Sequence, residues 1–148
     1  MTWSSSDAWL LTAAYVTEEN PVSLRSLFAA GDGINHAIFT EEEIDHGLTR
    51  LEAAGLACLD GETIMLTDDA KRLCEEAVKS SPYILDGMER VEAALRKIDL
   101  TGKEATPVEV PKRALRAALE QYQKDAARII AELGTRTRKA ARARPFKT

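Results

Sequence analysis

The residue types that most often bind metals or act as nucleophiles are scarce in this chain and are not spaced for chemistry. His36 and His46 stand ten residues apart, and Cys58 and Cys74 do not form the Cys-x-x-Cys pairs typical of zinc sites. Gly31-Asp32-Gly33 is too short for a glycine-rich phosphate loop, and no serine or cysteine lies in a nucleophile motif. These observations predict a protein that is not an enzyme and that binds no metal or cofactor.

Charge is distributed unevenly along the 148 residues, although the formal net charge is only −4. Residues 1–80 carry 5 Lys and Arg against 15 Asp and Glu, whereas residues 81–134 carry 9 of each sign. Residues 135–148 follow Gly134, carry no acid, and are predicted to form a disordered basic tail. Such a tail contacts nucleic-acid phosphate, folds back on the acidic N-terminal part, or only aids solubility. Its cations are Arg136, Arg138, Lys139, Arg142, Arg144 and Lys147.

Two helices are expected before residue 40. The first begins at Ser6, which is a good cap, and Asp7 then lies at the positive end of the helix dipole. Asn20-Pro21 ends this helix, because proline cannot continue it. A second helix begins after Ser23 and is expected to be loose or broken at Gly31-Asp32-Gly33.

The third helix is the best marked and precedes a hairpin. Thr40 and Glu43 have the spacing of a capping box, and Gly55 supplies a left-handed stop. Asp60-Gly61 then separates two short apolar segments, which predicts a β-hairpin, and Thr67 caps a further helix. Three helices whose common apolar face is closed by a hairpin make a winged helix, so we expect a mainly α protein of that class.

The same region resembles bacterial winged-helix regulators of the MarR and PadR types. The likeness lies in the run LTRLEAAGL at Leu48–Leu56, the Asp60-Gly61 turn, and the IMLT segment at Ile64–Thr67. It covers roughly residues 7–79 and departs from the family pattern at Ala70, where a glycine is usual. The resemblance implies a third helix that enters the DNA major groove and a wing that reaches phosphate, but a shared fold does not by itself imply a shared function.

Two further helices are predicted beyond residue 80. Ser81-Pro82 begins one and Pro111 begins the other, with a polar connection over residues 101–110. Apolar residues recur in both at alternating steps of three and four, which is typical of helices that pair along a seam. The two helices therefore pair with each other, pack on the rest of the chain, or pair with a second subunit. The packing candidates in the last helix are Leu115, Leu119, Tyr122, Ile129 and Leu133.

The residues expected to meet DNA in a winged helix are mostly acidic here. The third helix carries the acids Glu41–Glu43, Asp45 and Glu52, and the wing tip is Asp60-Gly61-Glu62. Base recognition usually relies on Arg, Lys, Asn or Gln, and a duplex repels carboxylates. The candidate contacts to a protein or nucleic acid are His46, Thr49 and Arg50 in the third helix, together with the cations of the tail.

We therefore expect a non-enzymatic winged-helix regulatory or adaptor protein that acts through protein–protein contact. The alternative is a dimeric transcriptional regulator that binds double-stranded DNA and contacts phosphate through its tail. The domains are predicted as a winged helix over 1–80, a helical extension over 81–134 and the basic tail over 135–148. A cytoplasmic location is expected, because the N-terminus lacks signal-peptide features and no apolar run is long enough to span a membrane.

Overall fold

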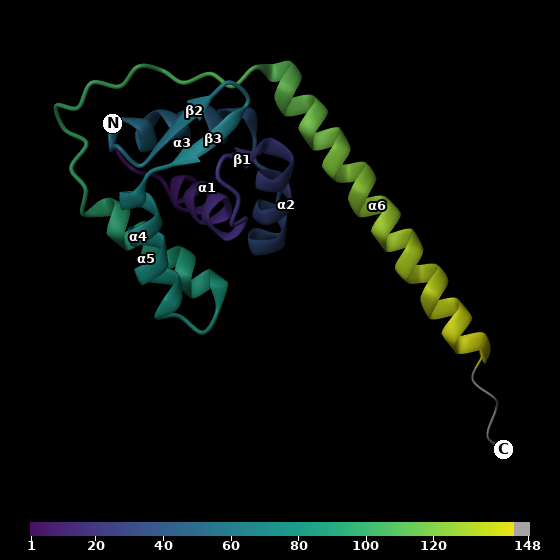
Figure 1. Cartoon of the computed structure of the whole chain (residues 1–148). Coiled ribbons are helices and arrows are strands. Elements are labelled where there is room, and N and C mark those ends of the chain that lie inside the picture. The colour runs from purple at the N-terminus through teal and green to yellow at the C-terminus, as the bar shows by residue number, and fades with distance from the viewer. Residues whose placement is uncertain (144–148) are drawn as a thin grey trace.

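The computed structural model describes the backbone of residues 1–143 and the side chains of residues 1–138. Within this part the chain is mainly helical, with six helices and a small antiparallel sheet of three strands (Figure 1). No helix among the described residues is both long enough and apolar enough to cross a bilayer. The elements in chain order are α1 (Ser5–Val16), β1 (Val22–Ser23), α2 (Leu24–Asn35), α3 (Glu41–Ala53), β2 (Ala57–Asp60), β3 (Thr63–Leu66), α4 (Asp68–Lys79), α5 (Ile84–Arg96) and α6 (Lys112–Ala143).

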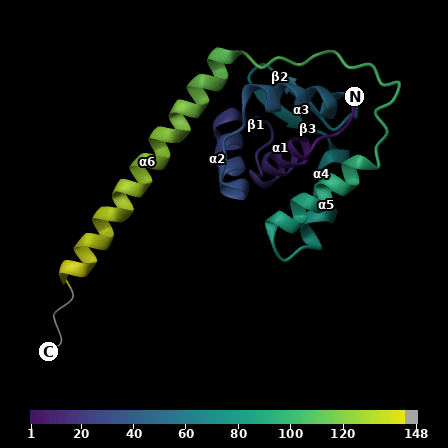
Figure 2. The same cartoon turned by 180° about the vertical axis from the view of Figure 1, so that it is seen from behind.

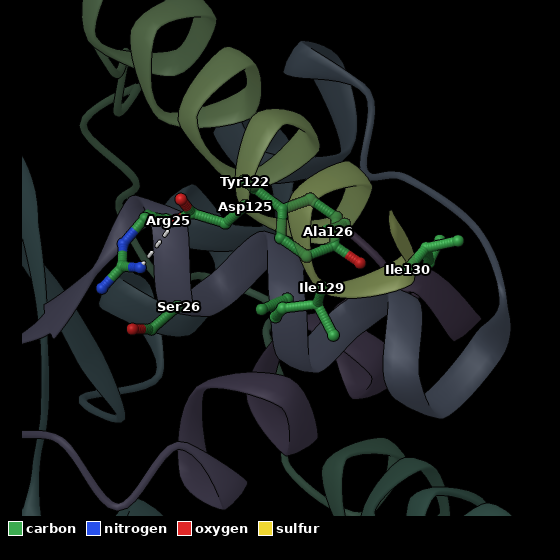
Figure 3. A pocket seen from close by; sticks show the side chains of 8 residues that line it. Arg25, Ser26, Tyr122, Asp125, Ala126, Ile129 and Ile130 are labelled. Carbon is green, nitrogen blue, oxygen red and sulfur yellow. Dashed lines mark hydrogen bonds and ion pairs between the residues drawn. The ribbon is translucent and has the colours of Figure 1, made fainter. Parts of the chain in front are cut away.

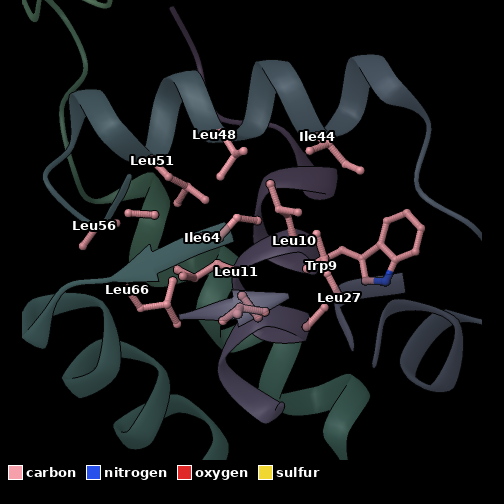
Figure 4. Close-up of a cluster of buried hydrophobic side chains, with 14 of the residues drawn as sticks. Trp9, Leu10, Leu11, Leu27, Ile44, Leu48, Leu51, Leu56, Ile64 and Leu66 are labelled. Carbon is pink, nitrogen blue, oxygen red and sulfur yellow. The ribbon is translucent and has the colours of Figure 1, made fainter. Parts of the chain in front are cut away.

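Helix α1 forms the centre of the core. Eight consecutive residues from Asp7 to Ala14 are buried, and the helix packs against α2, α3, α4 and α5. Figure 4 shows Leu48 and Leu51 of α3 pointing toward Leu10 and Leu11 of α1. A helix that is apolar on all sides has to be enclosed, so α1 requires neighbours on every face. We call α1–α5 with the sheet, residues 1–100, the helical body.

The cap of α1 differs from the sequence prediction. Ser4 is the cap rather than Ser6, and its backbone N–H donates to the Asp7 carboxylate at 2.8 Å. Asp7 is fully buried, whereas the sequence pattern treated it only as a favourable charge near a helix end. A buried carboxylate requires partners, and one partner of Asp7, Arg50, comes from α3.

Helix α2 runs without a break through the segment predicted to be loose. The Trp9 indole N–H donates to the Gly31 carbonyl at 3.0 Å, and the Trp9 ring stacks on Phe39 with 3.7 Å between the ring centroids. The Phe39 ring lies so close to Gly31 that no β-carbon would fit. Glycine therefore allows close packing here instead of interrupting the helix, and α2 ends only at His36, which is left-handed with φ of 52°.

The sheet contains one strand more than the sequence indicated. The two-residue strand β1 pairs with β3, so the order is β1-β3-β2, with Val22 opposite Ile64. Asp60 pairs with Thr63, which makes Gly61-Glu62 the hairpin loop instead of Asp60-Gly61. Gly61 has a φ of 63°, the left-handed conformation required at the first position of such a loop. The predicted hairpin is confirmed with its turn shifted by one residue.

The two helices beyond residue 80 do not form a hairpin with each other. Helix α5 begins at Ile84 instead of Ser81-Pro82 and packs against α1 and α4, whereas α6 packs against α2. The two helices lie on opposite sides of the helical body in both views (Figures 1 and 2). Trp3 joins the N-terminal segment to the residues that follow α5, because its indole N–H donates to the Ile98 carbonyl at 3.0 Å.

Helix α6 is longer than predicted. It has 32 residues and passes through Gly134 to Ala143, so the predicted end at Gly134 and the disordered state of residues 135–143 are wrong. Residues 144–148 of the predicted tail lie outside the described residues. Only the first half of α6 lies along the body, and the second half extends past α2 (Figure 2).

Replacing the α3 cap is expected to destabilise the fold. The Glu43 N–H donates to Thr40 Oγ1 at 3.1 Å, and the Thr40 N–H donates to the Glu43 carboxylate at 3.0 Å, as the capping box predicts. Thr40→Ala removes the first bond and should lower the free energy of unfolding by about 1 kcal/mol. Chemical denaturation measures this, with Thr2→Ala at an exposed position as the control. Equal stabilities of the two variants would contradict the cap.

Candidate interaction surfaces

The exposed side of α3 is covered in part by the connection between α5 and α6. Residues 103–111, which we call the strap, have no regular secondary structure and lead to the start of α6, with residues 97–102 between the strap and the end of α5 (Figure 1). The Val108 N–H donates to Thr49 Oγ1 at 2.9 Å, and the Val110 N–H donates to Asp45 Oδ1 at 3.0 Å. Both valines are buried. The strap thus occupies two polar side chains of the helix that would enter a DNA groove.

Arg50 is also engaged within the chain. Its Nη1 lies 3.0 Å from Oδ1 of Asp7, whose side chain is fully buried, while the Arg50 side chain is 23% exposed. Asp7 thereby receives a charged hydrogen bond in addition to the one from the Ser4 N–H. Releasing Arg50 to a phosphate would leave the Asp7 carboxylate buried with one partner fewer, which is costly. Arg50 is therefore a structural residue that joins α3 to α1.

The remaining groups on this side of the protein are mostly acidic. His46 is exposed, and among the described residues it is the one of the three predicted contacts on α3 whose side chain makes no hydrogen bond or ion pair. The hairpin tip carries Asp60 and Glu62, both exposed. Glu41 lies 3.8 Å from Arg116 of α6, an exposed pair that contributes little to stability. This face of the described structure therefore presents carboxylates where a winged helix would meet phosphate.

The first half of α6 is fixed to α2 by both apolar and polar contacts. Leu115 is buried, and Leu119 and Tyr122 are half-buried against the core. The Tyr122 hydroxyl donates to Asp32 Oδ2 at 2.5 Å, and this hydrogen bond, with burial, raises the pKa of Tyr122 to about 12. Of the five predicted packing candidates, these three pack within the chain.

The other two candidates, Ile129 and Leu133, lie in the second half of α6 and are exposed. Their exposed fractions are 51% and 55%, and that of the neighbouring Ile130 is 69%. A groove of about 380 Å³ lies between the two helices at this point, lined by residues of α2 and α6 (Figure 3). Arg25 of α2 closes one end through an ion pair with Asp125 at 3.0 Å. We call this feature the α2–α6 groove.

Two of the basic residues predicted to contact phosphate have described side chains, and both lie in the second half of α6. Arg136 and Arg138 are exposed on the helix. Lys139 and Arg142 belong to its last turns, but their side chains lie outside the described ones, and Arg144 lies outside the described residues altogether. The structure thus places the part of α6 that carries Arg136 and Arg138 away from α3 and the hairpin (Figure 1).

Searches of protein-family models, of curated proteins and of solved structures found no match to this chain. Among the described residues no group of three or more His, Cys, Asp or Glu could hold a metal ion. Burial raises the pKa of the Cys74 thiol to about 12, which makes it a poor nucleophile.

Sequence reasoning missed the strap, the buried Asp7 and the α2–α6 groove. The sequence predicts only a polar connection over Thr101–Val110, and the alternation of Val108 and Val110 is the one sign that one side of it is buried. Asp7 offered a weaker sign, because it lies inside an apolar helix and four residues before Leu11. No local pattern indicates which distant side chain such groups will contact.

Removing a contact between the strap and α3 should speed the hydrogen exchange of the strap's backbone amides. In Thr49→Val the Val108 N–H loses its acceptor, so its protection from hydrogen exchange should fall severalfold, as expected for a bond worth about 1 kcal/mol. Thr106→Val changes an exposed strap residue in the same way and should leave the exchange unchanged. Rapid exchange of Val108 in the unmodified protein would show that the strap does not bind α3.

Removing Arg50 should destabilise the protein through Asp7. Arg50→Met is expected to cost about 1.5–3 kcal/mol of unfolding free energy, the usual range for a hydrogen bond to a charged group. Adding Asp7→Asn should recover part of the lost stability, because the buried side chain at position 7 is then neutral and no longer an unpaired charge. The control is Arg72→Met, which breaks an exposed pair with Asp69 and should cost under about 0.5 kcal/mol. Equal losses for Arg50→Met and Arg72→Met would contradict a structural role for Arg50.

Proposed function

We propose that this chain is a non-enzymatic regulatory or adaptor protein of the winged-helix class that acts through protein–protein contact in the cytoplasm. The order of three helices followed by a hairpin, with β1 pairing on β3, supports the winged-helix interpretation. The function itself is supported mainly by one observation. The strap binds Thr49 and Asp45, so the helix that would read bases already serves as a packing surface.

Three further features support protein contact over groove recognition. Arg50 is tied to the buried Asp7 and does not reach outward. The hairpin tip carries two exposed carboxylates, and the helical body as a whole has 8 Lys and Arg against 19 Asp and Glu. At physiological ionic strength the screening length of about 8 Å does not hide such charge from a duplex in direct contact. The apolar residues Ile129, Ile130 and Leu133, by contrast, offer a surface that suits another protein.

The alternative function is a dimeric transcriptional regulator that contacts double-stranded DNA through its tail. The exposed Arg136 and Arg138 on the projecting part of α6 favour it, because cations on an accessible helix attract phosphate. Contacts of this kind are independent of base sequence and position a protein on DNA without selecting a site. In this alternative α6, and not α3, makes the first contact.

Binding to DNA separates the two functions. The full chain at about 100 µM should not retard a mixed-sequence duplex at about 100 mM salt, because non-specific DNA-binding proteins with dissociation constants of about 1–100 µM bind half or more of the duplex at that concentration. Selection from a randomised duplex library should enrich no sequence. An enriched motif would contradict the proposal. Retardation that disappears in Arg136→Gln/Arg138→Gln would support the alternative instead.

A further inference from the structure

The apolar seam of α6 continues beyond the part of the helix that the helical body buries. Leu115, Leu119 and Tyr122 lie against α2, and the same series of three- and four-residue steps continues to Ile129 and Leu133, which are exposed. Figure 3 shows Ile129 and Ile130 on the last turns of α6 that border α2. A side of the helix that is buried over its first half therefore becomes an open apolar surface in the second half.

Beyond the turns that border α2, residues 131–138 of α6 are helical although all of them except Gly134 are exposed. The side-chain hydrogen bonds recorded there, from Thr135, Thr137 and Arg138, all go to backbone carbonyls of the same helix. Helices in proteins obtain most of their stability from packing of an apolar face, and this segment contains glycine and threonine, which weaken a helix. Packing against another molecule would supply that missing stability.

Charge indicates what kind of molecule fits. Residues 127–143 carry five Lys and Arg against one acid, Glu132, whereas the helical body has a net charge of −11. A complementary partner combines an apolar helix face with an acidic surface beside it. The chain itself carries both features, since the α2–α6 groove adjoins its own acidic body.

We propose that the occupant of this surface is a second copy of the chain. Ile129, Ile130 and Leu133 of each copy pack across a two-fold axis against the same residues of the other copy and enter its α2–α6 groove beside Ala29. This inference rests on the proposed function, because it names the partner for the protein contact. A two-fold arrangement buries the exposed apolar residues of both copies at once, since each copy offers the same groove and the same apolar residues.

The charges also select the direction of the two α6 helices. A parallel pair would place the cations of one distal half beside those of the other, which is repulsive. An antiparallel pair runs each basic distal half, with Arg136 and Arg138, toward the partner's acidic helical body. The dimer is therefore antiparallel, and its affinity falls as salt screens this attraction.

The mass of the full chain in solution tests the dimer. Sedimentation or light scattering at about 50 µM should give twice the 16.3 kDa of one chain for the unmodified protein. Ile129→Lys/Leu133→Lys should give a monomer, because both charges would lie in the seam. Ala131→Lys, on the opposite side of the same turns, is the matched control and should remain dimeric. Since all three positions are exposed within one chain, these variants should keep the far-ultraviolet circular dichroism of the helical body.

Either of two results would overturn the inference. One is an unmodified chain that is monomeric in solution. If that monomer binds vesicles of anionic lipid, the basic and apolar second half of α6 serves a membrane surface instead of a second copy. The other is a dimer that Ile129→Lys/Leu133→Lys leaves intact, because its interface would lie elsewhere. Either result contradicts only the dimer, and the proposed function is retained if the chain does not bind DNA. An enriched DNA motif contradicts the proposed function whether the chain is a monomer or a dimer.

Discussion

A segment that leaves regular secondary structure must still find partners for its backbone groups, and this requirement governs how the strap and α3 are arranged. Backbone N–H groups that are buried without a partner are costly, so a strap that buries Val108 and Val110 needs acceptors at those positions. Thr49 and Asp45, one turn apart on α3, provide them at 2.9 and 3.0 Å. The strap leads directly into α6, so its position along α3 sets where α6 begins.

Three carboxylates of the helical body have a structural role in this arrangement. Glu43 closes the cap of α3, Asp45 holds the strap, and Asp7 holds Arg50 between α1 and α3. Each of these carboxylates has a partner within the chain, and each would be a poor neighbour for phosphate. Two of these carboxylates, Asp7 and Asp45, therefore hold α3 against α1 and against the strap.

Local signals in the sequence predicted the elements well, and distant contacts account for the differences. The α3 capping box, the Gly55 stop and the Thr67 cap depend on residues within four positions of one another, and all three are present. The continuity of α2 depended instead on Phe39 packing against Gly31, and the two-residue strand β1 exists only because β3 pairs with it. Gly134 lies in the middle of α6, although glycine is the usual end of a helix. At the candidate surfaces, the apolar spacing of Leu115 through Leu133 was visible in the sequence, but which of these residues find a partner within the chain was not.

The contact between the strap and α3 is measured most directly by nuclear Overhauser effects in the full chain. The account predicts cross-peaks between the Val108 amide proton and the Thr49 side chain, and between the Val110 amide proton and the Asp45 β-protons. Chemical shifts typical of unfolded peptide for residues 103–111, with no cross-peaks to α3, would contradict it and leave the helix free to meet a groove.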